Sequence, residues 1–143
     1  MSSEDLKGVI GESHEDGFPI VWKFVDELPD QSILQSLPHL VVIAWNYDGS
    51  SNNGMPPNDI LEQMKDLEAE IDEKIARDTF LKHAYSKTGN NIKELVYYAH
   101  DTDLFIDELN SALASHPRYP LDISFYEDAD WSEFKHILSL FRK

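Results

Sequence analysis

An acidic segment near the C-terminus contains the side chains best suited to chemistry. Glu127, Asp128 and Asp130 lie close together and are followed at once by Trp131. Neighbouring carboxylates can chelate a hard cation, or act as a paired acid and base with a histidine such as His100. The same arrangement is typical of a solvated connection or of a helix cap. The segment is therefore a candidate metal or hydrolase site, with a structural role as the alternative.

Other motifs give little support to catalysis. Glu133 and His136 form a single E-x-x-H spacing, whereas a di-iron centre needs two such pairs and further glutamates. The loop from Asp48 to Gly54 resembles a calcium loop, but Asn53 stands where that loop requires glycine. The chain has no cysteine, no G-x-S-x-G motif and no glycine-rich phosphate loop. These observations predict no catalytic residue and no cofactor.

A group of aromatic residues is the second candidate site. Trp45 and Tyr47 alternate onto one face of an apolar segment, where Tyr97 or Tyr98 can lie beside them, and Trp131 follows near the C-terminus. An aromatic sheet face can stack RNA bases, contact a protein, form a homodimer or line a small-molecule pocket. Packing in the core is the structural alternative. We treat these aromatic residues as candidate binding residues.

The elements that must position these side chains follow from hydrophobic periodicity. Alternation with a period of two, or an apolar run, predicts strands at residues 18–25, 40–47, 79–85, 91–99 and 118–126. Apolar residues at steps of three and four predict helices at 57–77, 103–115 and 131–141. One further helical turn is expected at 32–37. Asp130 with Glu133 imitates a capping box for the last helix.

The predicted order is strand, strand, helix, strand, strand, helix, strand, helix. Residues 40–126 alone follow the split βαβ, or ferredoxin-like, order. We therefore predict an α+β fold with a mainly antiparallel sheet and with the helices on one face. The last helix is expected either at an end of the sheet or on its otherwise open face. Residues 1–17 are polar and glycine-containing and predict a flexible lead-in, so that residues 18–143 form a single domain.

The charge of the chain restricts its partners. Twenty-seven acidic residues against 12 basic ones give a formal net charge of −15. Nucleic-acid binding requires lysine and arginine to displace counterions from phosphates, so we expect no nucleic-acid partner and no anionic membrane surface. No apolar run approaches the ~20 residues that span a bilayer, and the N-terminus lacks the pattern of a signal peptide. Together with the absence of cysteine, this predicts a cytoplasmic protein that can accept a basic protein partner.

Several short motifs in order resemble one known family. They are Trp45-Asn46-Tyr47-Asp48, Gly54-Met55-Pro56, Leu67-Glu68, Val96-Tyr97-Tyr98, Leu109-Asn110 and Phe125-Tyr126-Glu127-Asp128-Ala129-Asp130-Trp131-Ser132. This set resembles the bacterial domain-of-unknown-function family six-nine-five. In that family proline and glutamate are usual where this chain has Ala129 and Asp130. The resemblance supplies no catalytic residues. Some related chains are joined to a domain similar to a protein inhibitor of a bacterial ribonuclease, which implies regulation through protein contact.

Two functional hypotheses follow. The first is a non-enzymatic cytoplasmic interaction or regulatory module that uses an aromatic sheet face or a sheet edge to contact a protein partner or a second copy. The alternative is a metal-dependent hydrolase, or a small-molecule binder, that uses the acidic turn at residues 127–130.

Overall fold

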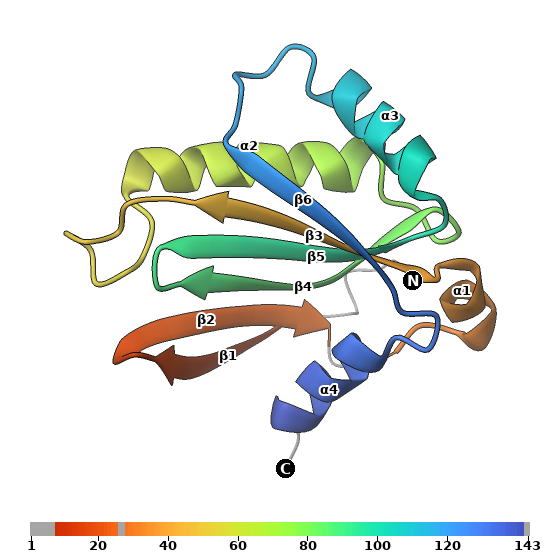
Figure 1. Ribbon diagram of the computed structural model, residues 1–143, viewed down its shortest axis with the longest axis horizontal. Coiled ribbons are helices and arrows are strands. Elements are labelled where there is room, and N and C mark those ends of the chain that lie inside the picture. The colour runs from red at the N-terminus through yellow and green to blue at the C-terminus, as the bar shows by residue number, and fades with distance from the viewer. Residues whose placement is uncertain (1–7, 26–27, 142–143) are drawn as a thin grey trace.

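The fold is a six-stranded sheet with helices packed against both of its faces (Figure 1). The computed structural model describes residues 8–25 and 28–141. Its strands are β1 (Gly8–Glu15), β2 (Phe18–Val25), β3 (His39–Asn46), β4 (Leu81–Gly89), β5 (Ile92–Ala99) and β6 (Leu121–Glu127). Its helices are α1 (Gln31–Ser36), α2 (Asn58–Lys74), α3 (Thr102–Ala112) and α4 (Ser132–Phe141). The prediction of an α+β fold is confirmed.

The strand order places the C-terminal strand at one edge of the sheet. The order is β1-β2-β4-β5-β3-β6, and every neighbouring pair is antiparallel. β4 and β5 form a hairpin that turns at Asn90 and Asn91, both of which have positive φ angles. α2 connects β3 to β4 and α3 connects β5 to β6. As a result β3 lies between β5 and β6, and the two edges are β1 and β6.

Side chains along β3 alternate between two separate hydrophobic clusters, one on each face of the sheet. Leu40 and Val42 face α1 and α4, whereas Val41 and Ile43 face α2 and α3. The prediction that the helices pack on one face holds for α2 and α3 but is wrong for α1. α4 occupies the otherwise open face, one of the two positions expected for it, because its apolar stripe must be covered and is buried on the side opposite α2.

The prediction of a flexible lead-in at residues 1–17 is wrong for Gly8–Glu15, which form strand β1. Gly8–Glu15 pairs along its whole length with β2, and Ser13 Oγ accepts a hydrogen bond of 2.9 Å from Trp22 Nε1. Glycines and charged residues weaken the strand pattern of this segment, so its pairing depends on the apolar β2 beside it. Asp16 and Gly17 form the turn between β1 and β2, and residues 1–7 of the lead-in lie outside the described residues.

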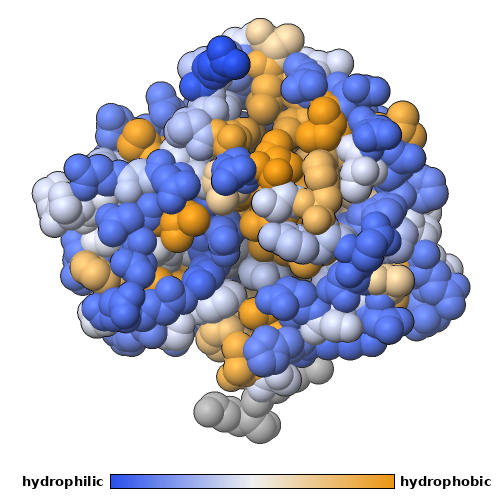
Figure 2. All heavy atoms as spheres, in the orientation of Figure 1, coloured by the Kyte–Doolittle hydropathy of each residue, from blue (hydrophilic) through white to orange (hydrophobic). Residues whose placement is uncertain are grey.

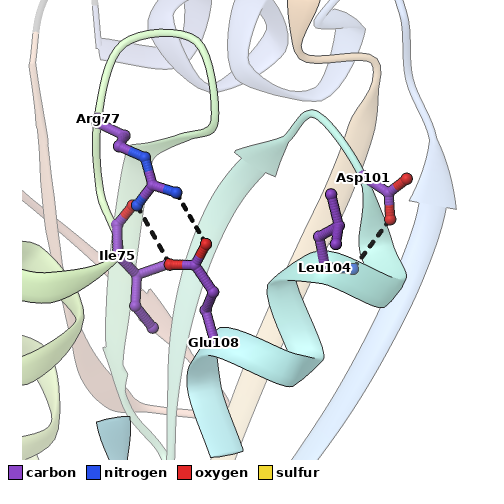
Figure 3. Close-up of polar contacts among 5 residues, drawn as sticks. All are labelled: Ile75, Arg77, Asp101, Leu104 and Glu108. Atoms are coloured by element: carbon purple, nitrogen blue, oxygen red, sulfur yellow. Dashed lines mark hydrogen bonds and ion pairs between the residues drawn. The ribbon is translucent and has the colours of Figure 1, made fainter. Parts of the chain in front are cut away.

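A polar link ties the end of α2 to α3 (Figure 3). Arg77 Nη1 and Nη2 donate to the two carboxylate oxygens of Glu108 over 3.2 and 2.8 Å, and Nη1 also donates to the Ile75 carbonyl. Asp101 Oδ1 accepts from the Leu104 N–H and caps α3. This arrangement holds α2, α3 and the beginning of β4 together.

Candidate functional site

The aromatic residues predicted as a binding face are mostly buried, and they lie on both sides of the sheet. Trp45, Tyr97 and Trp131 are 3%, 0% and 1% exposed. Trp45 and Tyr97 belong to the cluster under α2 and α3, whereas Trp131 belongs to the cluster under α1 and α4. Tyr47 is partly buried, and its hydroxyl donates to the Gly54 carbonyl over 2.6 Å. These side chains therefore form no shared exposed platform.

Within the acidic turn, Asp128 is the cap of α4. Its Oδ1 accepts from the Ser132 N–H over 2.9 Å, and its Oδ2 accepts from the Glu133 N–H over 3.0 Å and from the Tyr98 hydroxyl over 2.6 Å. Burial alone would raise the pKa of Asp128, but these hydrogen bonds lower it below its usual value. The prediction that Asp130 caps the helix is wrong, because the left-handed backbone at Trp131 delays the helix start to Ser132.

The remaining acids of the turn point to other partners. Glu127 Oε2 lies 2.7 Å from His39 Nδ1 on the adjacent strand, and Asp130 is exposed. Within residues 8–25 and 28–141, the acidic and histidine side chains that have metal-ligand spacing are instead those of Glu68, Asp72 and His83. The structure thus does not bring the three acids of the turn together as a ligand set.

The carboxylate–histidine cluster, defined as Glu68, Asp72 and His83, joins α2 to β4. Glu68 and Asp72 are one helical turn apart and therefore project from the same side of α2. His83 lies on β4, directly before an irregularity in the pairing of β4 with β5. One ligand atom from each residue lies within 4.8 Å of the other two. The β-bulge redirects side chains locally, and such bulges are common beside functional sites.

The orientation of the His83 ring follows from its hydrogen bond. Nε2 lies 3.1 Å from the Tyr85 carbonyl oxygen, which can only accept, so Nε2 carries the proton and donates. Nδ1 then has a free lone pair, and it lies 4.0 Å from Glu68 Oε2. This distance is too long for a hydrogen bond. Tyr97 stacks on the imidazole with ring centroids 4.6 Å apart and an interplanar angle of 25°.

Burial sets the electrostatics around the cluster. It lowers the pKa of His83, so the ring is neutral at neutral pH. Asp72 is exposed as a residue, but its carboxyl group is partly desolvated by the surrounding protein, which together with the Glu68 charge raises its pKa to about 6. Burial also lowers the pKa of Lys93, whose Nζ donates to Thr88 Oγ1 over 3.0 Å. Two acids thus face a neutral imidazole, with lysine charge nearby on the sheet.

A cleft of about 640 Å³ opens beside the cluster. Asp72 and His83 form part of its wall, and the rest is mainly apolar, including Ile33 of α1, Leu81 of β4 and Phe134 of α4. The cleft passes around the end of β4, where α2 stops and α1 and α4 approach from the other side. It gives solvent access to two of the three cluster residues.

The edge strand β6 is the second feature that remains open to partners. Phe125 and Tyr126 are 39% and 55% exposed and point to opposite faces, and Leu104 at the start of α3 is 50% exposed. Leu121 and Ile123 are only partly buried. Figure 2 shows hydrophobic atoms gathered in the upper centre of the molecule, over β6 and α3.

Comparison with known proteins places the chain in one family. The model of a family of unknown function, DUF695, matches residues 12–139, which is nearly the whole chain. The chain belongs to this family. No curated protein and no solved structure matches it. Among the described residues of this family member, no helix has both the length and the apolarity needed to cross a bilayer.

The sequence pattern did not indicate the carboxylate–histidine cluster, although it showed two of the three residues at a helical spacing. Glu68 and Asp72 are four residues apart on a predicted helix, and the pattern assigns both to its solvent-exposed face. His83 is fifteen positions from Glu68 in the chain and belongs to a different element, so only packing brings it to the carboxylates. For Phe125 and Tyr126 the signal was the strand pattern itself, which does not reveal that β6 is an edge.

Proposed function

We propose that this domain binds proteins, and that the outer edge of β6 accepts an extended, basic segment of a partner chain. The observation that carries the proposal is an edge strand with a large exposed aromatic residue, Phe125, and, within the strand itself, no lysine, proline or bulge. This is the sheet-edge form of the interaction or regulatory hypothesis.

The backbone of β6 supports addition of a strand. Among the described residues, no strand pairs with the outer side of β6. Natural edge strands are usually protected by lysine, proline or a bulge. β6 reads LDISFYE, without lysine or proline, and its seven residues pair with β3 in an unbroken register. Its outer N–H and C=O groups are therefore placed to bind an extended peptide through main-chain hydrogen bonds.

Side chains along the edge define the chemistry of the partner. Phe125 is exposed, and Leu121 and Ile123 on the same face of β6 are partly buried, which favours apolar residues at alternate positions of the partner. Asp122 on β6 is exposed, as is Asp103 in the first turn of α3. Because the whole chain carries a formal charge of −15, a partner with interspersed lysine or arginine is favoured over a second copy.

The same charge supports the absence of a nucleic-acid partner, and we retain a cytoplasmic location as part of the proposal. We further infer that the region from β3 to β6 is a ferredoxin-like split βαβ unit. The order β4-β5-β3-β6, with α2 and α3 in the crossovers, supports this inference. In such a unit the last strand is an edge, which is where the proposed contact lies.

The alternative of a metal-dependent hydrolase or small-molecule site at residues 127–130 has less support. Asp128 is used as a helix cap, and Glu127 is paired with His39. Binding through Trp45, Tyr47, Tyr97 and Trp131 has less support for a related reason. The three that are almost fully buried can contribute to binding only by holding the sheet in shape.

The test uses a synthetic peptide of alternating lysine and valine with a central phenylalanine, and a matched peptide with glutamate in place of lysine. We expect the basic peptide to slow hydrogen exchange of β6 amides and to bind more weakly as salt concentration rises. Phe125→Asp should weaken binding at least tenfold, whereas Ile10→Asp on the other edge, at a side chain 70% exposed, should not.

Several outcomes would overturn the proposal. They are protection of β1 instead of β6, equal binding of the acidic peptide, or equal loss from the two variants. If sedimentation shows self-association and Phe125→Asp abolishes it, the partner at the β6 edge is a second copy of the chain and not a basic segment of another protein.

A further inference from the structure

A second feature of the molecule, independent of the β6 edge, is a buried hydroxyl with no partner next to the carboxylate–histidine cluster. Tyr97 is 0% exposed, and its hydroxyl has no hydrogen-bond partner among residues 8–25 and 28–141. A buried hydroxyl without a partner destabilises a fold by about 1–3 kcal/mol, so each such group calls for an explanation. Its ring stacks on His83, which places Tyr97 against the cluster itself.

Tyr97 lies on the sheet face that α2 covers, on the same side as the cluster. Burial raises the pKa of Tyr97 well above its usual value, and the charges of Asp72 and Glu68 add to this effect. A cation or an ion-bound water among these acids would give the hydroxyl a partner, which it lacks among the protein atoms.

The histidine of the cluster is oriented as metal-binding histidines are. In protein metal sites the imidazole usually donates its second N–H to a carbonyl or carboxylate, which fixes the tautomer. His83 makes this hydrogen bond from Nε2 to the Tyr85 carbonyl, and its free Nδ1 faces Glu68. The three donors are therefore one imidazole nitrogen and two carboxylates, supplied by a helix and a neighbouring strand.

We propose that Glu68, Asp72 and His83 bind a divalent transition-metal ion, with zinc as the reference ion, between α2 and β4. Imidazole donors favour zinc, nickel and cobalt over magnesium and calcium, which prefer oxygen alone. Three protein ligands leave a fourth position of a tetrahedral ion for water, as in zinc sites that are open to solvent. Asp72 and His83 also line the cleft, which provides the route of entry.

The geometry requires a small closure of the cluster. Ligand atoms around a zinc ion at about 2.1 Å are separated by roughly 3.4 Å in a tetrahedral arrangement. The donor atoms of the cluster lie within 4.8 Å of one another, so they must approach by up to about 1.4 Å. Asp72 is exposed and Glu68 is partly exposed, so rotation of their side chains can supply this movement while His83 stays fixed.

The charges around the cluster are compatible with a cation. The two carboxylates of α2 face the neutral imidazole of His83, and Lys93 on β5 and Lys23 on β2 bring positive charge to the same region. Lys93 is held by Thr88 through a hydrogen bond of 3.0 Å. The negative charges of the two carboxylates offset the positive charges of the two lysines. Binding of the metal ion then changes the net charge of the region.

The test uses the full chain after chelator treatment, titrated at constant pH with zinc, cobalt, magnesium or calcium chloride. Calorimetry should show one zinc per chain, and cobalt should give the visible absorption of a low-coordinate nitrogen–oxygen site. Magnesium and calcium should bind at least tenfold more weakly than zinc. His83→Gln and Asp72→Asn should each weaken zinc binding at least tenfold.

The matched control is His116→Gln. His116 also contacts a carboxylate of α2, with Nε2 3.3 Å from Glu70 Oε1, but it lacks a third ligand. This variant should bind zinc as the wild type does. The site is refuted if wild-type protein binds no zinc, or if the three variants behave alike. Because Asp72 is exposed, Asp72→Asn should fold even if His83→Gln does not, and unchanged binding by that variant would also refute the site.

Discussion

The hydroxyl of Tyr98 should contribute more to stability than its single oxygen atom suggests. It donates to Asp128 Oδ2 over 2.6 Å and accepts from the Phe134 N–H over 3.3 Å. The ring is fully buried and stacks on Trp131 with centroids 4.0 Å apart and an angle of 7°. Tyr98→Phe keeps this stacking and removes only the hydroxyl, so the variant isolates the two hydrogen bonds.

The expected loss is about 2–3 kcal/mol in the free energy of unfolding. A hydrogen bond to a charged group contributes roughly 1.5–3 kcal/mol, and the Phe134 amide would also lose its side-chain acceptor. Urea denaturation should show a lower midpoint with an unchanged slope, since the surface exposed on unfolding is the same. The melting temperature should fall by several degrees.

Tyr85→Phe is the matched control, because its hydroxyl also faces an acid of α4 on the same side of the sheet. The distance from that hydroxyl to Glu133 Oε2 is 3.4 Å, so its loss should cost under ~0.5 kcal/mol. A double-mutant cycle between Tyr98→Phe and Asp128→Asn should show coupling of at least about 1 kcal/mol. Equal effects of the two tyrosine variants, or additive effects in the cycle, would refute the assigned role of the hydroxyl.

Two further stability predictions follow from backbone geometry and from the cap of α4. Gly89 has φ +148°, and a Cβ there would collide with the Pro19 carbonyl oxygen; Gly89→Ala should therefore lower the urea midpoint more than Gly17→Ala, where φ is +84° and the space is open. The expected costs are at least about 3 kcal/mol and about 1–2 kcal/mol. Because hydrogen bonds lower the pKa of Asp128 in the folded state, its stabilising effect is complete above its unfolded pKa of about 3.9 and is lost as the pH falls through the folded value. Midpoints measured from pH 6 to pH 3 should fall less steeply for Asp128→Asn than for the wild type.

Much of the fold was predictable because its strongest patterns are local. The apolar run at residues 40–47 predicted a strand, and β3 occupies that segment with helices on both of its sides. The regular stripe at 57–77 predicted α2, whose Met64, Leu67 and Ile71 are buried. By contrast, β1 has a weak pattern of its own and was missed, since its strand structure depends on pairing with β2.

In the acidic turn the capping-box spacing identified the wrong residue as the cap of α4, two positions from the residue that caps it. The spacing of Asp130 and Glu133 imitates a capping box, yet Asp128 makes the hydrogen bonds to the first turn. The buried Trp131 adopts a left-handed backbone, with Nε1 donating to the Leu37 carbonyl over 3.0 Å. Anchoring this side chain in the core determines where the helix begins, and no short-range pattern reports that anchor.

The class of the fold, the type of most elements and the acidic net charge all follow from the amino-acid sequence alone. These depend on side-chain periodicity and composition, which are properties of neighbouring residues. The folded structure was needed to show three further features. Helices cover both faces of the sheet, Trp45 and Tyr97 are core residues, and His83 lies close to Glu68 and Asp72. These depend on strand order and on the side of the sheet to which each helix docks, and both are set by packing between residues far apart in the chain.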